Sequence, residues 1–371
     1  MEKTDLIAEI NLKRIGQNVK ALKTLAGKNT SLMAVVKANG YGHGAVEVSK
    51  KAIESGASLL GVSRAEEALE LRENKINSRI LTLGYPCKNM IEDVCKNNID
   101  ISIYDYETAR AVSARAKEIK TKVKVHLKID TGMGRVGIPG DINEITKEVK
   151  KIINLENIDP IGIFTHFSSA DEKDLEYTYF QMNKFYSLLK NLEKDKIFFE
   201  FFHCANSAGL INIKESRKSL VRPGISIYGL YPSPEIDKNI INLVPAMTLK
   251  ARIVQVKKVK KGTYVSYGRT WRAKKDSKLA SIAIGYADGF SRLLSSKTHV
   301  LINGKKAPLR GKICMDLCVA DISEIENVNP GDYAIIFTDK IITADYHSEK
   351  LGTINYEIVS SLTSRAKRVY V

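Results

Sequence analysis

The sequence has few of the residues that build cross-linked or metal-bound proteins. Its 371 residues include one tryptophan and only five cysteines, which are Cys87, Cys95, Cys204, Cys314 and Cys318. The cysteines are odd in number and none of them belongs to a Cys-x-x-Cys pair. This pattern argues against a disulfide scaffold and a structural zinc site, and it favours a reducing cytoplasm. We expect no metal.

Long apolar runs are also missing. No stretch approaches the roughly 20 residues that a membrane-spanning helix needs. The first residues, Met-Glu-Lys-Thr-Asp, carry charges and lack the apolar core of a signal peptide. We therefore expect a cytoplasmic protein with no membrane partner, long enough for two domains or for one large barrel with an appendage.

Acidic residues are outnumbered by basic ones, 42 to 58, and the formal net charge is +16. Such a charge can indicate nucleic-acid binding. However, the lysines are spread over most of the chain, and the densest cluster, residues 257–261, is predicted to lie on an exposed strand and turn. Zinc-finger spacing, an RNP motif and an arginine-rich arm are all absent from the sequence. The charge thus favours solubility and attraction of small anions over a nucleic-acid partner.

The first two thirds of the chain alternate between short apolar runs and amphipathic segments. The runs begin at Leu32, Ala57, Arg79, Asp100, Val123, Ile158, Phe199 and Leu220. Segments with helical spacing follow at Val46–Ser55, Arg64–Asn74, Asn89–Asn97, Tyr106–Ile119, Asp141–Ile153 and Asp174–Leu192. The connection 208–219 has only a weak helical pattern. Eight strands, each followed by a helix, predict an α/β fold with a (β/α)8 TIM-type barrel over residues 1–242.

The pattern changes after Leu243. Short apolar runs at 249–260, 279–285, 299–302, 307–314 and 332–337 are separated by turns rich in Gly, Asn and Pro. We predict a mostly β C-terminal domain over residues 243–371, with a short helix near Tyr356–Thr363. About the first ten residues are expected to pack with this domain.

Lys37 stands out in the segment Met33–Gly44. It ends the apolar run that starts at Leu32, and burial lowers a lysine pKa and makes the amine a usable nucleophile or Schiff-base partner. Glycines at 40, 42 and 44 allow a sharp turn and a close approach to a ligand. A strand-end lysine that extends into solvent is the alternative reading.

Barrel enzymes place their sites at the carboxyl ends of the strands. In this sequence those ends carry Lys37, Arg135, His166, Asn206, Ser207 and the segment Arg222–Ile225. Loops after the last two strands often bind phosphate through backbone N–H groups, for which Ser207, Gly224 and Ile225 are suited, with Tyr41 reaching over from the first loop.

Several segments resemble the alanine racemase family along nearly the whole chain. They are AVVKANGYGHG (34–44), KIDTGMGRVG (128–137), THFSSAD (165–171), CANSAG (204–209), VRPGISIYG (221–229), SYGRTW (266–271), GYADGF (285–290), CMD (314–316) and NYEI (355–358). The resemblance implies a barrel followed by a β-domain, pyridoxal 5'-phosphate as cofactor, and a head-to-tail homodimer with shared active sites. It also implies interconversion of L- and D-alanine that supplies D-alanine for peptidoglycan.

The same resemblance implies roles for individual residues. Lys37 would hold the cofactor as an aldimine and act as one catalytic base, and Tyr267, from the partner subunit, would be the other. His166 and Arg222 would form the hydrogen-bonded network that supports the tyrosine. Tyr356 would contact the phosphate.

Arg222 would face the pyridine nitrogen. An arginine cannot accept a proton, so it would leave that nitrogen neutral and disfavour decarboxylase or transaminase chemistry. Arg135 would bind the substrate carboxylate, helped by the Met315 backbone N–H of the partner subunit. Lys128 would be carbamylated, with an unmodified lysine as the alternative.

One position departs from the family pattern, because Lys312 stands where an arginine is common near the access corridor. It leaves substrate preference open. The alternatives are a racemase of the same mechanism that prefers serine or a broader range of amino acids, and a protein that binds pyridoxal phosphate without turnover.

Overall fold

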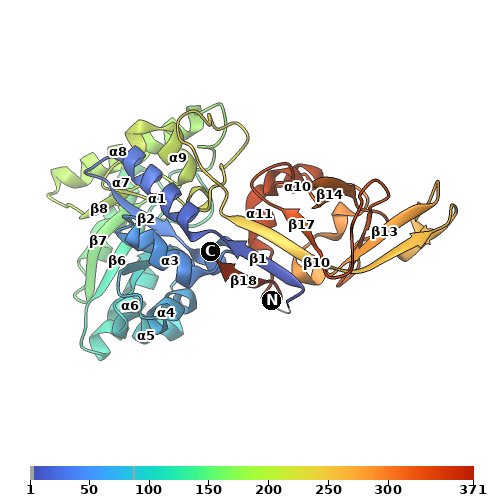
Figure 1. Cartoon of the computed structure of the whole chain (residues 1–371). Helices are drawn as coiled ribbons and strands as arrows, with labels where there is room; N and C mark the ends of the chain where they lie inside the picture. Colours follow the sequence, from blue (N-terminus) through green and yellow to red (C-terminus); the bar gives the residue numbers. More distant parts are fainter. Residues whose placement is uncertain (1–3, 87) are drawn as a thin grey trace. The chain divides into compact units, whose positions relative to one another are not determined.

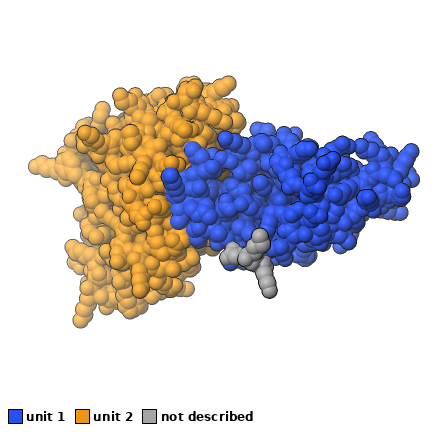
Figure 2. All heavy atoms as spheres, in the orientation of Figure 1, with its two compact units in different colours: residues 1–14, 41–44, 244–371 blue, residues 15–40, 45–243 orange. Residues whose placement is uncertain are grey.

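The computed structural model describes residues 4–86 and 88–371, so Cys87 lies outside the described part. These residues form two compact units, which Figure 2 distinguishes by colour. The first unit, which is orange and marked unit 2 in Figure 2, comprises Ile15–Gly40 and Ala45–Leu243. The second, which is blue and marked unit 1, comprises residues 4–14, Tyr41–Gly44 and Val244–Val371.

The first unit is built on eight parallel strands, and all eight predicted strands are confirmed (Figure 1). Their order in the sheet is β8-β7-β6-β5-β4-β3-β2-β9. The strands are β2 (Ser31–Val35), β3 (Leu59–Val62), β4 (Arg79–Thr82), β5 (Asp100–Ile103), β6 (Val123–Lys128), β7 (Ile158–Phe164), β8 (Phe201–His203) and β9 (Leu220–Val221). The Arg222 N–H donates to the Ala205 carbonyl at 3.0 Å, which joins the two ends of this order into a closed barrel.

Helices follow the strands, as the amphipathic segments predict. They are α2 (Lys37–Tyr41), α3 (Ala45–Glu54), α4 (Ala65–Glu73), η1 (Lys88–Met90), α5 (Ile91–Lys96), α6 (Tyr106–Glu118), α7 (Ile142–Ile153), α8 (Glu176–Lys194) and α9 (Ser207–Asn212). Some of these helices begin with a side-chain cap. Asp105 accepts from the Thr108 N–H at the start of α6, and Asp141 forms a capping box with Glu144 at the start of α7.

Two features of this unit were not predicted correctly. Helix α1 (Leu12–Ala26) precedes the barrel and buries an apolar face that includes Ile15, Val19 and Leu22. The segment Arg222–Ile225 was placed in the last strand, but β9 ends at Val221. Pro223 has no N–H to donate to a sheet, and the chain turns at Gly224 into a short 3-10 helix, η3 (Ile225–Tyr228).

The second unit is a mostly β domain, in which the order β15-β14-β17-β10-β1-β18 is extended by β13 and β16. Strand β1 (Leu6–Ile10) pairs antiparallel with β10 (Met247–Val259) and parallel with β18 (Lys367–Tyr370). The remaining elements of this sheet are β13 (Ser277–Ile282), β14 (His299–Ile302), β15 (Lys305–Pro308), β16 (Cys318–Asp321) and β17 (Tyr333–Phe337). A small hairpin joins β11 (Tyr264–Val265) to β12 (Trp271–Arg272).

Helices α10 (Ala344–Leu351) and α11 (Asn355–Ser360) complete this unit. The short helix predicted near Tyr356–Thr363 corresponds to α11, whereas α10 was not predicted. The prediction of a strand over residues 307–314 is wrong, because β15 ends at Pro308 and the next strand, β16, begins only at Cys318. In the described ranges we find no helix that is both long and apolar enough to cross a membrane.

Candidate active site

Lys37 lies at the carboxyl end of β2, at the start of a tight left-handed turn. Ala38, Asn39 and Gly40 have φ values of 53°, 50° and 60°, a region that L-residues adopt at a cost. The Ala38 N–H donates to Oε1 of Glu67 at 2.6 Å, and Oδ1 of Asn39 accepts from the Ala45 N–H at 3.0 Å. Side chains therefore hold the lysine-bearing turn in place.

The environment of Lys37 favours a neutral amine. Burial lowers its pKa, the nearby Arg135 guanidinium lowers it further, and Glu67 partly opposes both effects. A larger fraction of the amine is thus unprotonated near neutral pH than for a solvated lysine, which is the form that attacks a carbonyl carbon.

Four cations gather on this rim of the barrel. Lys128 ends β6, is 8% exposed, and has a pKa lowered to about 8, first by burial and then by Arg135, Arg222 and Lys37. The half-buried His166, which follows β7, has its pKa lowered by burial and by the same four cations, so its ring is neutral. Such a concentration of positive charge suits a ligand with more than one anionic group.

Arg222 is held at the centre of this cluster. It is 3% exposed. Its Nη2 donates to the carbonyls of Thr165 at 2.7 Å and Cys204 at 3.1 Å and approaches Nδ1 of His166 at 3.3 Å, while Nη1 donates to Nδ1 of His203 at 2.7 Å. Burial lowers its pKa to about 10, so the guanidinium stays charged at neutral pH. All four contacts involve Nη1 or Nη2. The N–H of Nε takes part in none of them and can donate to a ligand.

Arg135 extends from an ordered loop after β6. The Asp130 carboxylate accepts from the N–H groups of Gly132 and Gly134, and the Tyr177 hydroxyl donates to the Gly132 carbonyl at 2.8 Å. The arginine itself is exposed. The loop thus fixes the backbone while the guanidinium can reach an incoming carboxylate.

A small polar cradle lies between α9 and η3. Oγ of Ser207 accepts from the N–H groups of Gly224 at 2.9 Å and Ser226 at 3.4 Å, so its own hydroxyl hydrogen is free to donate. Oγ of Ser226 is buried without a hydrogen-bond partner among the described residues. Asn206 caps α9 by accepting from the Gly209 N–H, and Ile225 is the first residue of η3, whose N–H has no acceptor within the helix.

The second unit contributes further candidates in two groups. The rings of Tyr41 and Tyr356 lie with centroids 6.1 Å apart, one from the first loop and one from α11. Tyr267 and Met315, by contrast, are 68% and 53% exposed on two neighbouring loops.

Ser266 links these two loops, because its Oγ donates to the Lys312 carbonyl at 2.6 Å and contacts Sγ of Cys314. Tyr267 and Met315 are therefore exposed on two loops that hydrogen bonds of Ser266 hold together.

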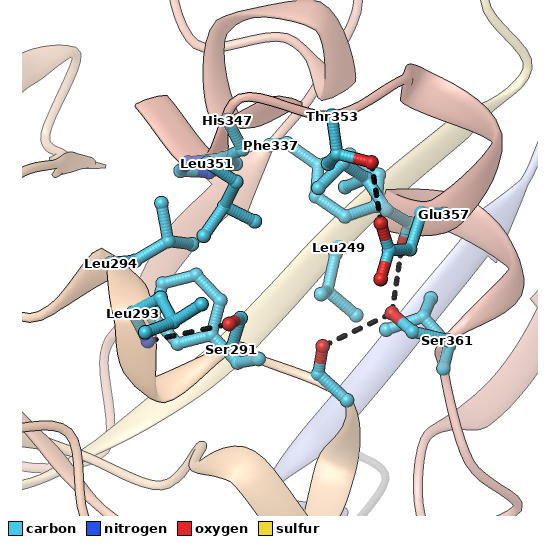
Figure 3. A pocket seen from close by; sticks show the side chains of 14 residues that line it. Leu249, Ser291, Leu293, Leu294, Phe337, His347, Leu351, Thr353, Glu357 and Ser361 are labelled. Carbon is cyan, nitrogen blue, oxygen red and sulfur yellow. Dashed lines mark hydrogen bonds between the residues drawn. The ribbon is translucent and has the colours of Figure 1, made fainter. Parts of the chain in front are cut away.

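A separate apolar cavity of about 130 Å³ lies within the second unit, between η6 (Arg292–Leu294), α10 and α11 (Figure 3). Its walls are mainly leucine and phenylalanine side chains. The Glu357 carboxylate at its edge already accepts from the Thr353 hydroxyl. Without a cluster of charged groups, this cavity is not a candidate for the chemistry.

Comparison with known proteins agrees with this geometry over the full chain. Residues 10–232 match the family model "Alanine racemase, N-terminal domain", and residues 246–370 match "Alanine racemase, C-terminal domain". The chain belongs to the alanine racemase family. An alanine racemase is an isomerase that interconverts L- and D-alanine.

Individual racemases are similar in sequence and in structure. The alanine racemase of Desulforamulus reducens is 46% identical over 100% of both chains, and that of Methanococcus maripaludis is 45% identical over 98% of both. The solved alanine racemase of Clostridium difficile 630 has a TM-score of 0.97 at 38% identity, covering 100% of this chain and 97% of its own. The structure from Bacillus anthracis with bound L-Ala-P has a TM-score of 0.93 at 33% identity, covering 100% and 96%.

The structure brings five of the thirteen sequence-predicted site residues together at the barrel rim. Lys37, Lys128, Arg135 and Arg222 form a positively charged cluster there, and the neutral ring of His166 lies beside it. Sequence reasoning missed Asp100, His126 and His203, which lie buried behind Arg222. The signal that could have found them is a polar residue within an apolar barrel strand.

Proposed function

We propose that this protein racemises alanine on pyridoxal 5'-phosphate held at the rim of the barrel. The observation that carries the proposal is the cluster of Lys37, Lys128, Arg135 and Arg222, in which a lysine of lowered pKa lies among fixed cations. The substrate is a carboxylate and the cofactor a phosphate ester, so both carry the charge that such a cluster attracts.

The residues present fit the cofactor. The Ser207 hydroxyl and the Gly224–Ile225 backbone would hold the phosphate, with Asn206 capping the helix that follows. The family resemblance adds Tyr41 and Tyr356 to the residues that would contact the phosphate. Arg222, with Nε uncommitted, would donate to the pyridine nitrogen and leave it unprotonated, because a guanidinium has no acceptor. The unpartnered Ser226 hydroxyl is consistent with a polar ligand in this cradle.

When bound, the cofactor acidifies the α-hydrogen of the amino acid by delocalising the electrons that remain on the α-carbon. Lys37 would hold the cofactor covalently and would remove or deliver a proton on one face of the α-carbon. Tyr267 of the partner subunit would deliver or remove a proton on the opposite face, so that the centre is inverted. His166 supports the tyrosine, and Arg135 with the partner's Met315 N–H fixes the substrate carboxylate.

The proposed working form is a head-to-tail homodimer. The exposure of Tyr267 and Met315 on loops of the second unit supports it, because large exposed side chains that serve no role in one chain are typical of a shared interface. Lys312 lies in the same loop pair, beside Gly268, where it can affect access to the site. The product D-alanine would serve cell-wall peptidoglycan synthesis in the cytoplasm.

Chiral analysis tests the proposal directly. Purified protein with pyridoxal phosphate is incubated separately with L-alanine and L-serine, and the D-isomers are quantified over time. We expect rapid formation of D-alanine. Faster formation of D-serine would retain the mechanism and change the substrate, whereas bound cofactor without either D-isomer would refute catalysis.

A further inference from the structure

A chain of buried polar side chains runs through the barrel interior behind Arg222. Nη1 of Arg222 lies 2.7 Å from Nδ1 of His203, and Nε2 of His203 lies 2.9 Å from Nδ1 of His126. Nε2 of His126 points toward Oδ2 of Asp100 at 3.8 Å, and that oxygen accepts from Nε of Arg79 at 2.8 Å. The chain thus links the rim of the barrel to the amino-terminal ends of β5 and β4.

The direction of the hydrogen bonds in this chain is fixed by its first member. A guanidinium only donates, so Nδ1 of His203 must accept and its proton must lie on Nε2. That N–H then donates to Nδ1 of His126, which places the second proton on Nε2 of His126. Burial and the neighbouring Arg222 lower the pKa of His203, and burial lowers the pKa of His126, so both rings are neutral and each carries one proton.

Packing prevents either ring from turning over. His203 stacks on Phe164 with centroids 4.8 Å apart and planes 4° apart, and His126 stacks on Phe201 at 5.9 Å and 13°. Gly162 leaves the space for His126, because a Cβ at that position would lie 2.1 Å from its Nδ1. The ring orientations that this proton assignment requires are therefore also held by packing.

The far end of this hydrogen-bonded network carries two carboxylates, Asp100 and Glu200, which share one cation, Arg79, and therefore has a net negative charge. Lys37, Lys128 and Arg135 surround the rim, and no carboxylate is bonded to Arg222 in the described part of the chain. The separation of 3.8 Å is too long for a hydrogen bond, and Nε2 of His126 has no other partner among the described residues. Its N–H dipole nevertheless points at the Asp100 carboxylate, which makes each imidazole upstream a better acceptor.

We propose that His203, His126 and Asp100 are positioning residues that orient Arg222 and transmit the charge of a carboxylate at the far end of the barrel to it. This inference rests on the proposed function, in which Nε of Arg222 contacts the cofactor ring. The Arg79–Glu200 ion pair anchors Asp100, so the effect of substitutions should decline with distance from Arg222, in the order His203, His126, Asp100, Glu200.

Imidazole ¹⁵N NMR on the cofactor-free full chain tests the geometry without any assay of activity. From roughly pH 7 to 9 we expect both His203 and His126 to remain neutral with the proton on Nε2, because burial lowers both pKa values from the ordinary value of histidine. A proton on Nδ1 of either ring, or an imidazolium in this range, would overturn the proposal even if the protein racemises alanine. Conversely, the expected spectrum from a protein that does not racemise alanine would refute the proposed function and leave the hydrogen-bonded network of His203, His126 and Asp100 intact.

Two variants complete the test. Asp100→Asn keeps the size of the side chain and removes the charge, and should shift the ¹⁵N resonances of His203 and of the Arg222 guanidinium. Ser102→Ala is the matched control, because Ser102 is a buried residue on the same strand whose hydroxyl donates to the Thr82 carbonyl, outside the chain. The control should leave those resonances unchanged.

In the cofactor-loaded enzyme, Asp100→Asn should lower kcat roughly 10-fold, within the range for residues that orient a directly acting group, without a matching change in the KM for alanine. Ser102→Ala should retain the wild-type kcat. Equal losses in both variants, or no ¹⁵N shift in Asp100→Asn, would show that Asp100 has only a structural role.

Discussion

The burial of Lys128 predicts how the free energy of unfolding of this protein depends on pH. Its pKa of about 8 lies below the 10.5 of a solvated lysine. Between these two values the unfolded chain binds more protons than the folded chain, so stability must increase as the pH rises through this window. The folded state is penalised fully below about pH 8, where the ammonium is buried among Arg135, Arg222 and Lys37.

The magnitude follows from the linkage relation. With pKa values of about 8 folded and 10.5 unfolded, protonation of Lys128 lowers the free energy of unfolding by about 3 kcal/mol at pH 7 and by about 1 kcal/mol at pH 10. Lys128→Met removes this titration while keeping an unbranched side chain against Phe164. The difference in stability between wild type and variant should therefore change by about 2–3 kcal/mol across this range.

Urea unfolding of both proteins at equal concentration, in buffer free of carbon dioxide, measures the effect. Added bicarbonate provides a second arm, because a carbamate on Lys128 would replace a buried cation by an anion facing three cations. It should stabilise wild type at neutral pH, leave Lys128→Met unaffected, and add a labile mass to Lys128 under native conditions. Parallel stability curves of wild type and variant between pH 7 and pH 10 would refute the electrostatic reasoning.

Four other predictions concern the site and its assembly. Lys37→Ala should lose the absorbance of covalently held cofactor and nearly all racemisation, and retained activity would remove the central claim. Tyr267→Phe should impair the L-to-D reaction far more than cofactor binding, measured by kinetics and by titration with cofactor; wild-type behaviour would place the second base elsewhere. Gly162→Ala should destabilise the protein by about 1–3 kcal/mol through overpacking against His126, measured by urea unfolding, and an unchanged midpoint would contradict the contact. Dilution below the dimer dissociation constant should lower specific activity, and a fully active monomer in sedimentation would exclude a shared site.

Much of the fold could be predicted because its signals are local. Each barrel strand is a short apolar run and each helix has its own 3.6-residue spacing, so eight strands were recognised one at a time. The wrong predictions lie where the local sequence signal is weak or where tertiary contacts decide the secondary structure. The segment after Val221 is apolar enough for a strand, but Pro223 and Gly224 turn it. Strand β16 is only four residues long.

The sequence by itself identifies the proposed reacting groups, because Lys37, Arg222 and Tyr267 stand in short segments that match the alanine racemase family. Only the tertiary structure decided the electrostatic state of the basic residues at the barrel rim, Lys37, Lys128 and Arg222. The lowered pKa of Lys128 requires cations from separate strands and loops to meet at one rim. The two histidines behind Arg222 are 77 positions apart, and only closure of the barrel brings their rings within 2.9 Å. Such contacts depend on distances that no local pattern encodes.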